Sequence, residues 1–372
     1  MEALRPHVVN LRQGRFSEGG AMDTSPADVD ALFAGPLRRA LDAARARGEP
    51  LRIVFYAHGG LVSEARGLRY AHDVAAWWKQ NRVYPIFFVW ETGLWETLSQ
   101  LLRGRRGLER GFSDVSDRLL EETARVAGGP RIWGGMKYSA ERSVGSDGGA
   151  RYVAHKLGAF VAAAGHAVEL HAVGHSAGAI FHSWFIPEAL NAGAGGFRTV
   201  SLLAPAIRAD AFVDRLGPLL SGGTAVRSLA VFTMSRSFEL RDHCAQVYRK
   251  SLLYLIHHAL EPRRGDALLG LEASIRADAR LRKLLGLEGA SPHAVIWSPT
   301  QASSGRSASR STSHGGFDND RATMESVMRR VLGASDTASI VPFPAIASRE
   351  LVFGEDDGAE ETDFGGGGAV AD

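Results

Sequence analysis

The chain has a single cysteine, Cys244, among its 372 residues. No disulfide can form within the chain, so its fold must be held by a hydrophobic core. A lone cysteine suits a protein of a reducing compartment. The first residues also lack the basic start and the apolar stretch of a secretory signal. These features lead us to expect a cytoplasmic protein.

Neither positive nor negative charge is in excess. Lys and Arg number 43 and Asp and Glu number 41, which gives a formal net charge of +2. This balance gives no reason to expect nucleic acid as a partner. The basic residues gather locally at one place, which we interpret as a solvated helix end: Arg103, Arg105, Arg106 and Arg110.

No apolar run is long enough to span a bilayer, so we expect no integral membrane segment. The sequence also lacks a His-Glu-x-x-His motif, a cysteine–histidine cluster and a Gly-x-x-x-x-Gly-Lys phosphate loop. Asp318-Asn319-Asp320 looks like the start of a calcium loop, but the glycine and the distal glutamate of that loop are missing. The sequence therefore predicts no metal ion and no cofactor.

Short apolar runs rich in β-branched and aromatic residues alternate with stretches of helical periodicity. The runs predict strands over residues 51–57, 83–90, 168–173, 199–204, 226–234 and 293–297, with a short strand pair over 7–16. Between them, the periodicity predicts helices that include residues 62–80 and 177–190. This alternation predicts an α/β fold with a mostly parallel central sheet and helices on both faces.

The chain is predicted to form one domain over residues 1–352. Residues 91–150 interrupt the strand–helix alternation and are mostly helical in pattern, with one apolar face: Leu94, Trp95, Leu98, Leu101 and Leu102. This insertion is either a cap over the site or an ordinary crossover helix pair. The acidic, glycine-rich tail over 353–372 buries nothing and is expected to be disordered.

Residues 174–178 read Gly-His-Ser-Ala-Gly, a Gly-x-Ser-x-Gly motif centred on Ser176. The motif alone is weak evidence, because the chain contains 43 glycines. Its context is stronger, because a predicted strand runs into it and a predicted helix follows it, as a nucleophile elbow requires. We therefore predict that Ser176 is a nucleophile and that the N–H of Ala177, at the start of the helix, faces the developing oxyanion.

A second glycine-rich turn, His58-Gly59-Gly60-Leu61, follows the strand predicted over 51–57. Glycine allows the backbone to approach a bound carbonyl and to direct an N–H toward it. We expect Gly60 or Leu61 to supply the second donor to the oxyanion. His58 is interpreted as a structural hydrogen-bonding residue.

A serine hydroxyl needs a base to take its proton. Of the thirteen histidines, His314 is best placed, because it follows the last predicted strand and precedes a helix that starts near Asp320. His175 and His182 are close to the serine in sequence, and neither is in the base position.

An acid must orient the base and stabilise its charged form. The loop after the strand predicted over 226–234 offers Asp242 as the first choice and Glu239 as another, while Asp210 lies one strand earlier. Asp318 and Asp320 follow His314 too closely to orient it and are expected to cap the last helix.

Taken together, these parts resemble the α/β-hydrolase superfamily, and its lipases and esterases in particular. The matching residues are the His58-Gly59-Gly60 loop, the elbow over 174–178, an acid near Asp242 and the late His314. Their order, Ser, Asp, His, agrees with that superfamily and differs from chymotrypsin and subtilisin. The resemblance covers residues 50 to 335 and implies an eight-stranded type of sheet and hydrolysis through an acyl-enzyme.

The leading hypothesis is a serine hydrolase that cleaves a carboxylic ester of a small molecule or lipid. Trp90, Leu94, Trp95 and Leu98 suggest an apolar acyl chain. One alternative is a catalytically silent hydrolase fold that binds protein. Another is an acyltransferase, thioesterase or peptidase that uses the same residues, because one fold hosts many chemistries.

Overall fold

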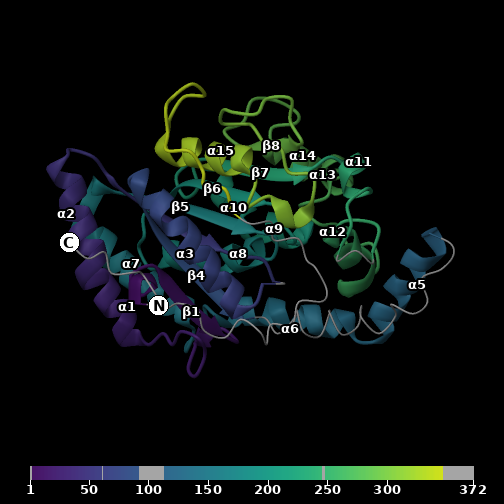
Figure 1. Ribbon diagram of the computed structural model, residues 1–372, viewed down its shortest axis with the longest axis horizontal. Coiled ribbons are helices and arrows are strands. Elements are labelled where there is room, and N and C mark those ends of the chain that lie inside the picture. Colours follow the sequence, from purple (N-terminus) through teal and green to yellow (C-terminus); the bar gives the residue numbers. More distant parts are fainter. Residues whose placement is uncertain (1, 61, 92–112, 245–247, 347–372) are drawn as a thin grey trace, which may run out of the picture.

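The computed structural model of the chain describes residues 2–60, 62–91, 113–244 and 248–346. In these residues, eight strands form one sheet in the order β2-β1-β4-β3-β5-β6-β7-β8 (Figure 1). β1 and β2 pair antiparallel, and every other neighbouring pair in this sheet is parallel. The predicted α/β fold with a mostly parallel sheet is confirmed.

The strands are β1 (Val8–Arg12), β2 (Arg15–Phe16), β3 (Leu51–Ala57), β4 (Val83–Glu91), β5 (Val168–His175), β6 (Phe197–Leu203), β7 (Leu229–Met234) and β8 (Ala294–Ser298). The pair expected over 7–16 forms as β1 and β2, and β1 also joins the main sheet beside β4. β5 runs two residues further than expected and includes His175.

The longer helices are α1 (Pro26–Leu32), α2 (Arg38–Ala46), α3 (Glu64–Gln80), α5 (Ser113–Val126), α6 (Gly129–Arg142), α7 (Gly149–Ala164), α8 (Gly178–Asn191), α9 (Ala209–Arg215) and α15 (Arg321–Leu332). Short helices are α10 (Gly217–Leu220), α11 (Arg236–Glu239), α12 (Leu252–Leu255), α13 (Glu272–Ala277) and α14 (Ala279–Leu284). Single turns of 3-10 or π-helix are η1 (Glu2–Leu4), η2 (Phe33–Leu37), η3 (Gly165–Ala167), η4 (Ile256–Leu260) and η5 (His314–Gly316).

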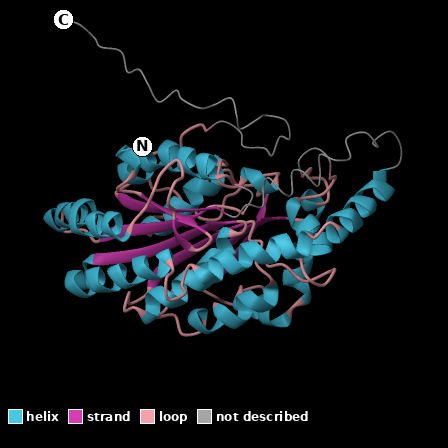
Figure 2. Cartoon of the chain, turned by 90° about the horizontal axis from the view of Figure 1, so that it is seen from below, coloured by secondary structure: helices cyan, strands magenta, loops and turns pink. Residues whose placement is uncertain are grey.

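Helices cover both faces of the sheet (Figure 2). Because side chains alternate along a strand, β3 supplies both cores. Ile53 and Phe55 belong to the cluster that also holds buried residues of α1, α2, α7 and α8. Val54 and Tyr56 belong to the other, which holds buried residues of α3 and α15. The sheet is therefore buried from both sides along its centre.

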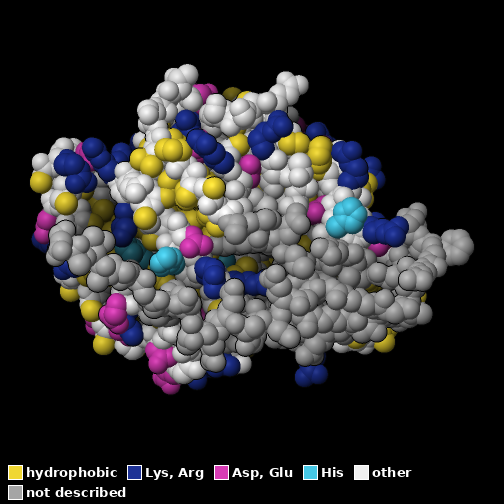
Figure 3. Space-filling view, in the orientation of Figure 1, with side chains coloured by type: hydrophobic (Ala, Val, Ile, Leu, Met, Phe, Trp, Pro, Cys, Tyr) yellow, Lys and Arg dark blue, Asp and Glu magenta, His cyan; other side chains and the backbone are white. Residues whose placement is uncertain are grey.

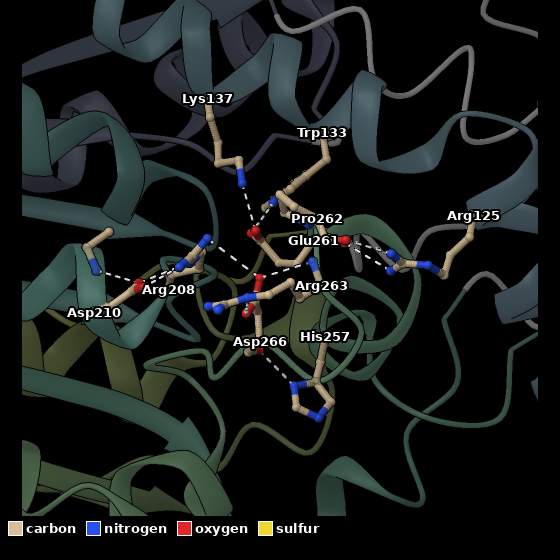
Figure 4. A network of polar contacts seen from close by, with 11 residues as sticks. Arg125, Trp133, Lys137, Arg208, Asp210, His257, Glu261, Pro262, Arg263 and Asp266 are labelled. Carbon is tan, nitrogen blue, oxygen red and sulfur yellow. Dashed lines mark hydrogen bonds and ion pairs between the residues drawn. The ribbon is translucent and has the colours of Figure 1, made fainter.

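Helices α5 and α6 form the described part of the insertion predicted over 91–150. The buried carboxylate of Glu261, at the end of η4, accepts hydrogen bonds from Trp133 Nε1 at 2.6 Å and Lys137 Nζ at 2.7 Å, both on α6 (Figure 4). Arg125, near the end of α5, donates to the Glu261 main-chain oxygen at 2.9 Å. These bonds join α6 and one end of α5 to the body of the fold, from which α5 projects (Figures 1 and 2).

Several expectations fall on residues outside the described part of the chain. They are the apolar face (Leu94, Trp95, Leu98, Leu101 and Leu102), the basic cluster from Arg103 to Arg110, Leu61, and the tail over 353–372.

On the face seen in Figure 3, basic and acidic side chains are dispersed over the surface. This agrees with the balanced composition of the chain. None of the helices in the described ranges is long and apolar enough to cross a membrane.

Candidate active site

The predicted site residues follow strands that end at one edge of the sheet. β3, β5, β7 and β8 are parallel, so their carboxyl ends meet there. His58 follows β3 and Ser176 follows β5. The loops after β7 and β8 carry Asp242 and His314. The topology thus brings together residues that are far apart in the sequence.

Ser176 occupies a sharp turn between β5 and α8. Its backbone has a φ of 53°, in the left-handed region that non-glycine residues rarely adopt. A Cβ on Gly178 would lie 2.1 Å from the main-chain oxygen of Ala57, and one on Gly174 would lie 2.8 Å from the backbone of Gly178. Both flanking positions therefore require glycine: a side chain at Gly178 would collide with the end of β3, and one at Gly174 would collide with the start of α8.

The hydroxyl of Ser176 is in contact with the ring of His314. Its Oγ lies 2.9 Å from His314 Nε2. Both side chains are buried, at 5% exposure each. Burial and, to a smaller extent, the neighbouring His175 lower the pKa of His314 to about 3. The ring is therefore neutral near pH 7, and with its proton on Nδ1 it can accept the hydroxyl proton at Nε2.

The glycine turn after β3 lies against the serine. A Cβ on Gly59 would be 3.2 Å from Ser176 Cβ and 3.7 Å from its Oγ. His58 Nε2 accepts the Trp90 main-chain N–H at 3.1 Å, so its Nδ1 carries the ring proton and donates to Gly59 O at 2.7 Å. This agrees with the structural role expected for His58.

The His58 ring also fixes the orientation of the next peptide group. In a trans peptide the C=O and the following N–H point in opposite directions. Since the Gly59 carbonyl points at His58, the N–H of Gly60 points away from that ring. The N–H of Ala177 has no acceptor among the residues that the structure describes.

Asp242 is the carboxylate in direct contact with His314. Its Oδ2 accepts the main-chain N–H of His314 at 2.8 Å, and its Oδ1 accepts the N–H of His243 at 2.8 Å. The Nδ1 of His314 is buried and has no hydrogen-bond partner within the described ranges. Asp242 is thus held beside His314, and the hydrogen bond described between them is made by the main-chain N–H of His314 rather than by its ring.

Glu239 and Asp210 have other partners. Glu239 is fully buried and accepts the hydroxyl of Ser251. Burial and, to a smaller extent, the nearby Asp242 raise the pKa of Glu239 to about 8. Asp210 pairs with Arg208, whose Nη1 lies 3.6 Å from Asp266 (Figure 4). The described contacts of these two carboxylates are therefore made away from His314.

The prediction for Asp320 is confirmed, and that for Asp318 is wrong. Asp320 caps α15, because its Oδ2 accepts the N–H of Thr323 at 2.9 Å. Asp318 instead accepts the hydroxyl of Tyr56 at 3.1 Å and lies 3.4 Å from His175 Nδ1. The position of Asp318 in the sequence, close to His314, could not reveal these contacts. Its partners Tyr56 and His175 belong to β3 and β5, which are far from Asp318 in the sequence.

Among the described residues, no group of three or more His, Cys, Asp or Glu side chains could hold a metal ion. No protein-family model, curated protein or solved structure matches the chain. The function must therefore be inferred from the chemistry of the site itself.

Proposed function

We propose that this chain is a serine hydrolase of the α/β-hydrolase type, which cleaves a carboxylic ester through an acyl-enzyme on Ser176. The observation that carries the proposal is the 2.9 Å contact between Ser176 Oγ and His314 Nε2, made by a serine with a φ of 53° between a strand and a helix. A serine with an ordinary structural role needs neither the strained turn nor a buried neutral imidazole.

The reaction begins when Ser176 Oγ attacks the ester carbonyl carbon while its proton moves to His314 Nε2. Negative charge then develops on the carbonyl oxygen. The N–H of Ala177, at the start of α8, and the N–H of Gly60 stabilise that charge. The protonated His314 returns the proton to the leaving alcohol, which departs as the acyl-enzyme forms.

Deacylation repeats these steps with water. His314 Nε2 removes a proton from a water molecule, whose oxygen attacks the acyl carbon. His314 then returns that proton to Ser176 Oγ as the bond to the acyl carbon breaks, which releases the carboxylic acid and restores the serine. Asp242 stabilises the positive charge that His314 carries in both halves of the reaction, because it is the carboxylate that contacts this residue directly.

The test is labelling by a fluorophosphonate probe, followed by turnover of p-nitrophenyl esters. We expect the folded protein to be labelled at Ser176 and to hydrolyse the esters. The Ser176→Ala variant should lose both properties and keep its fold by circular dichroism. Failure of the folded wild-type protein to label and to turn over these esters would contradict the proposal.

A further inference from the structure

A second buried histidine lies behind the proposed base. His175 immediately precedes Ser176 at the end of β5 and is 6% exposed. Its Nε2 lies 3.0 Å from the main-chain oxygen of His314, and the two ring centroids are 5.6 Å apart. Since a carbonyl oxygen only accepts hydrogen bonds, Nε2 of His175 must carry a proton.

The opposite nitrogen of the His175 ring faces a carboxylate. Nδ1 lies 3.4 Å from Asp318 Oδ2, an ion-pair distance. This carboxylate attracts the ring when Nδ1 carries a proton as well as Nε2, that is, when His175 is an imidazolium. Asp318 is itself held from two elements. Its carboxylate accepts the hydroxyl of Tyr56 on β3 at 3.1 Å, and its main-chain oxygen accepts the hydroxyl of Tyr70 on α3 at 3.4 Å. The far side of the ring is therefore anchored to the body of the fold.

His314 needs such support because of where it lies. It begins η5, a single turn of three residues in the connection between β8 and α15. Both of its main-chain polar groups are bound. Its N–H donates to Asp242 Oδ2 at 2.8 Å, and its C=O accepts from His175 Nε2 at 3.0 Å. These two bonds fix the direction in which the ring leaves the backbone.

We propose, on the basis of the proposed function, that His175 and Asp318 are positioning residues: Asp318 orients the His175 ring, whose Nε2–H holds the His314 carbonyl and keeps the base over Ser176. The residue before the nucleophile thus takes part in assembling the site. A base displaced by about 1 Å can lose on the order of a hundredfold in rate, so a single tether of this kind has a measurable effect.

The first test compares two replacements of His175 in the full-length protein with a p-nitrophenyl ester. His175→Met fills the space but has no donor, whereas the amide of His175→Gln can still donate to the His314 carbonyl. We expect kcat to fall about 10- to 100-fold in His175→Met with KM within about twofold, because only placement of the reacting group is lost. In His175→Gln, kcat should stay within about threefold of wild type.

His182 provides the matched control. It is buried on α8, and its Nε2 lies 2.9 Å from the main-chain oxygen of Val173. His182→Met and His182→Gln make the same two substitutions near the elbow, at a residue that does not contact His314. The two His182 variants should therefore have the same kcat. Tyr56→Phe, which removes only a hydroxyl from Asp318, is a milder variant and should lower kcat about two- to fivefold.

The pH profile separates positioning from a merely structural role. The groups around the base are His175 from β5, Asp242 from the loop after α11, and Asp318. His175 lowers the pKa of His314, and Asp318 raises it. Because burial holds the pKa of His314 at about 3, its ring stays neutral between about pH 6.5 and 8 in both His175 variants. If only positioning is lost, the ratio of kcat between His175→Gln and His175→Met should stay constant over this range, whereas a loss caused by partial unfolding should grow as the pH falls.

The outcomes are distinct. A folded His175→Met protein with wild-type kcat would overturn the positioning role, as would an equal loss in His175→Gln. If His175→Met does not fold, an unchanged kcat in Tyr56→Phe would overturn it instead. Absence of Ser176-dependent turnover in the wild-type protein would overturn the proposed function itself.

Discussion

The two carboxylates that follow β7, Asp242 and Glu239, lie in different environments. Asp242 accepts main-chain N–H groups from His314 and His243, two bonds that favour its charged form. Glu239 is fully buried against Ser251, and burial raises its pKa to about 8. Glu239 is therefore mostly protonated near pH 7. A neutral carboxyl group cannot stabilise an imidazolium, so Asp242 is the better candidate for the acid.

Matched substitutions test this assignment. Asp242→Asn should lower kcat by about 10³- to 10⁴-fold without unfolding the protein, because the imidazolium loses its charged partner. Glu239→Gln should leave kcat close to wild type, since it replaces a neutral group with one of similar shape. Asp210→Asn should do the same, because that carboxylate pairs with Arg208. Steady-state kinetics would refute the assignment if either control, rather than Asp242→Asn, abolished turnover.

At the residue scale, the sequence predicted local chemistry better than contacts across the fold. Ser176 and His314 were expected to meet, and their side chains are 2.9 Å apart. His175 and Asp318 were given no supporting role, although both contact the surroundings of the base. No sequence spacing reveals that Asp318 meets Tyr56, because the two residues are 262 positions apart. The available signal was the presence of a histidine in the elbow itself.

At the scale of elements, the elbow is a packing unit of β3, β5 and α8. The first turn of α8 lies directly on the end of β3, where the missing side chain of Gly178 allows the Ala57 carbonyl to approach. Ser176 is tied to the neighbouring strand as well, because its N–H donates to Leu203 O at 2.8 Å and its C=O accepts from Ala206 at 3.0 Å. The strained serine is thus held by bonds on both sides.

Gly178→Ala should therefore destabilise the whole fold. The added methyl would lie 2.1 Å from a backbone oxygen, which cannot move without displacing β3. Overpacking of this kind costs about 1 to 3 kcal/mol, and a clash with backbone lies at the upper end of that range. Gly135→Ala in α6 is the control, because nothing lies within 4 Å of its new Cβ and helix propensity favours alanine by about 1 kcal/mol. Thermal melting should show a lower Tm only for Gly178→Ala; an unchanged Tm there would contradict the packing argument.

Where a strand begins and ends depends on its pairing with neighbouring strands as well as on its own sequence pattern. β5 continues through Gly174 and His175 because both residues pair with β6, at Leu202 and Leu203. The glycine had suggested that the strand ended earlier. β7 begins at Leu229, which pairs with Val200. Val226, earlier in the predicted strand, forms an isolated bridge with Phe197 and lies outside β7. Such partners are set by the folded sheet and cannot be read from one strand alone.

For the molecule as a whole, the alternation of strands and helices predicted a parallel sheet covered on both faces, and the structure has one. The order of the strands was not predicted. β3 lies between β4 and β5, although its last residue, Ala57, and the first residue of β5, Val168, are 111 positions apart. The order of the strands in the sheet depends on how the connecting helices pack across it. That packing is made by contacts between segments that are far apart in the sequence.

The fold buries several histidines and keeps them neutral. Burial lowers the pKa of His7 and His182 to about 4, and that of His171 and His314 to about 3. In the unfolded chain these rings titrate near 6.5. Between the folded-state and unfolded-state pKa values of these rings, the unfolded chain binds more protons than the folded chain. The contribution of the neutral rings to the free energy of unfolding is therefore fully present above pH 6.5 and is lost as the pH falls below it. Glu239 acts in the opposite direction, because its raised pKa favours folding as the pH falls from about 8 toward 4.5.

Acid should therefore unfold the protein before it protonates the proposed base. At pH 5 each fully buried ring of this kind contributes a loss of about 2 kcal/mol, and four such rings outweigh the single opposing carboxyl. Urea unfolding should give a lower free energy at pH 5 than at pH 7, and His171→Gln should reduce that difference by about 2 kcal/mol. On acidification, esterase activity and ellipticity should fall together. Activity lost near pH 6 from a protein that stays folded would contradict the low pKa of His314, because it would mean that the base is protonated within an intact site.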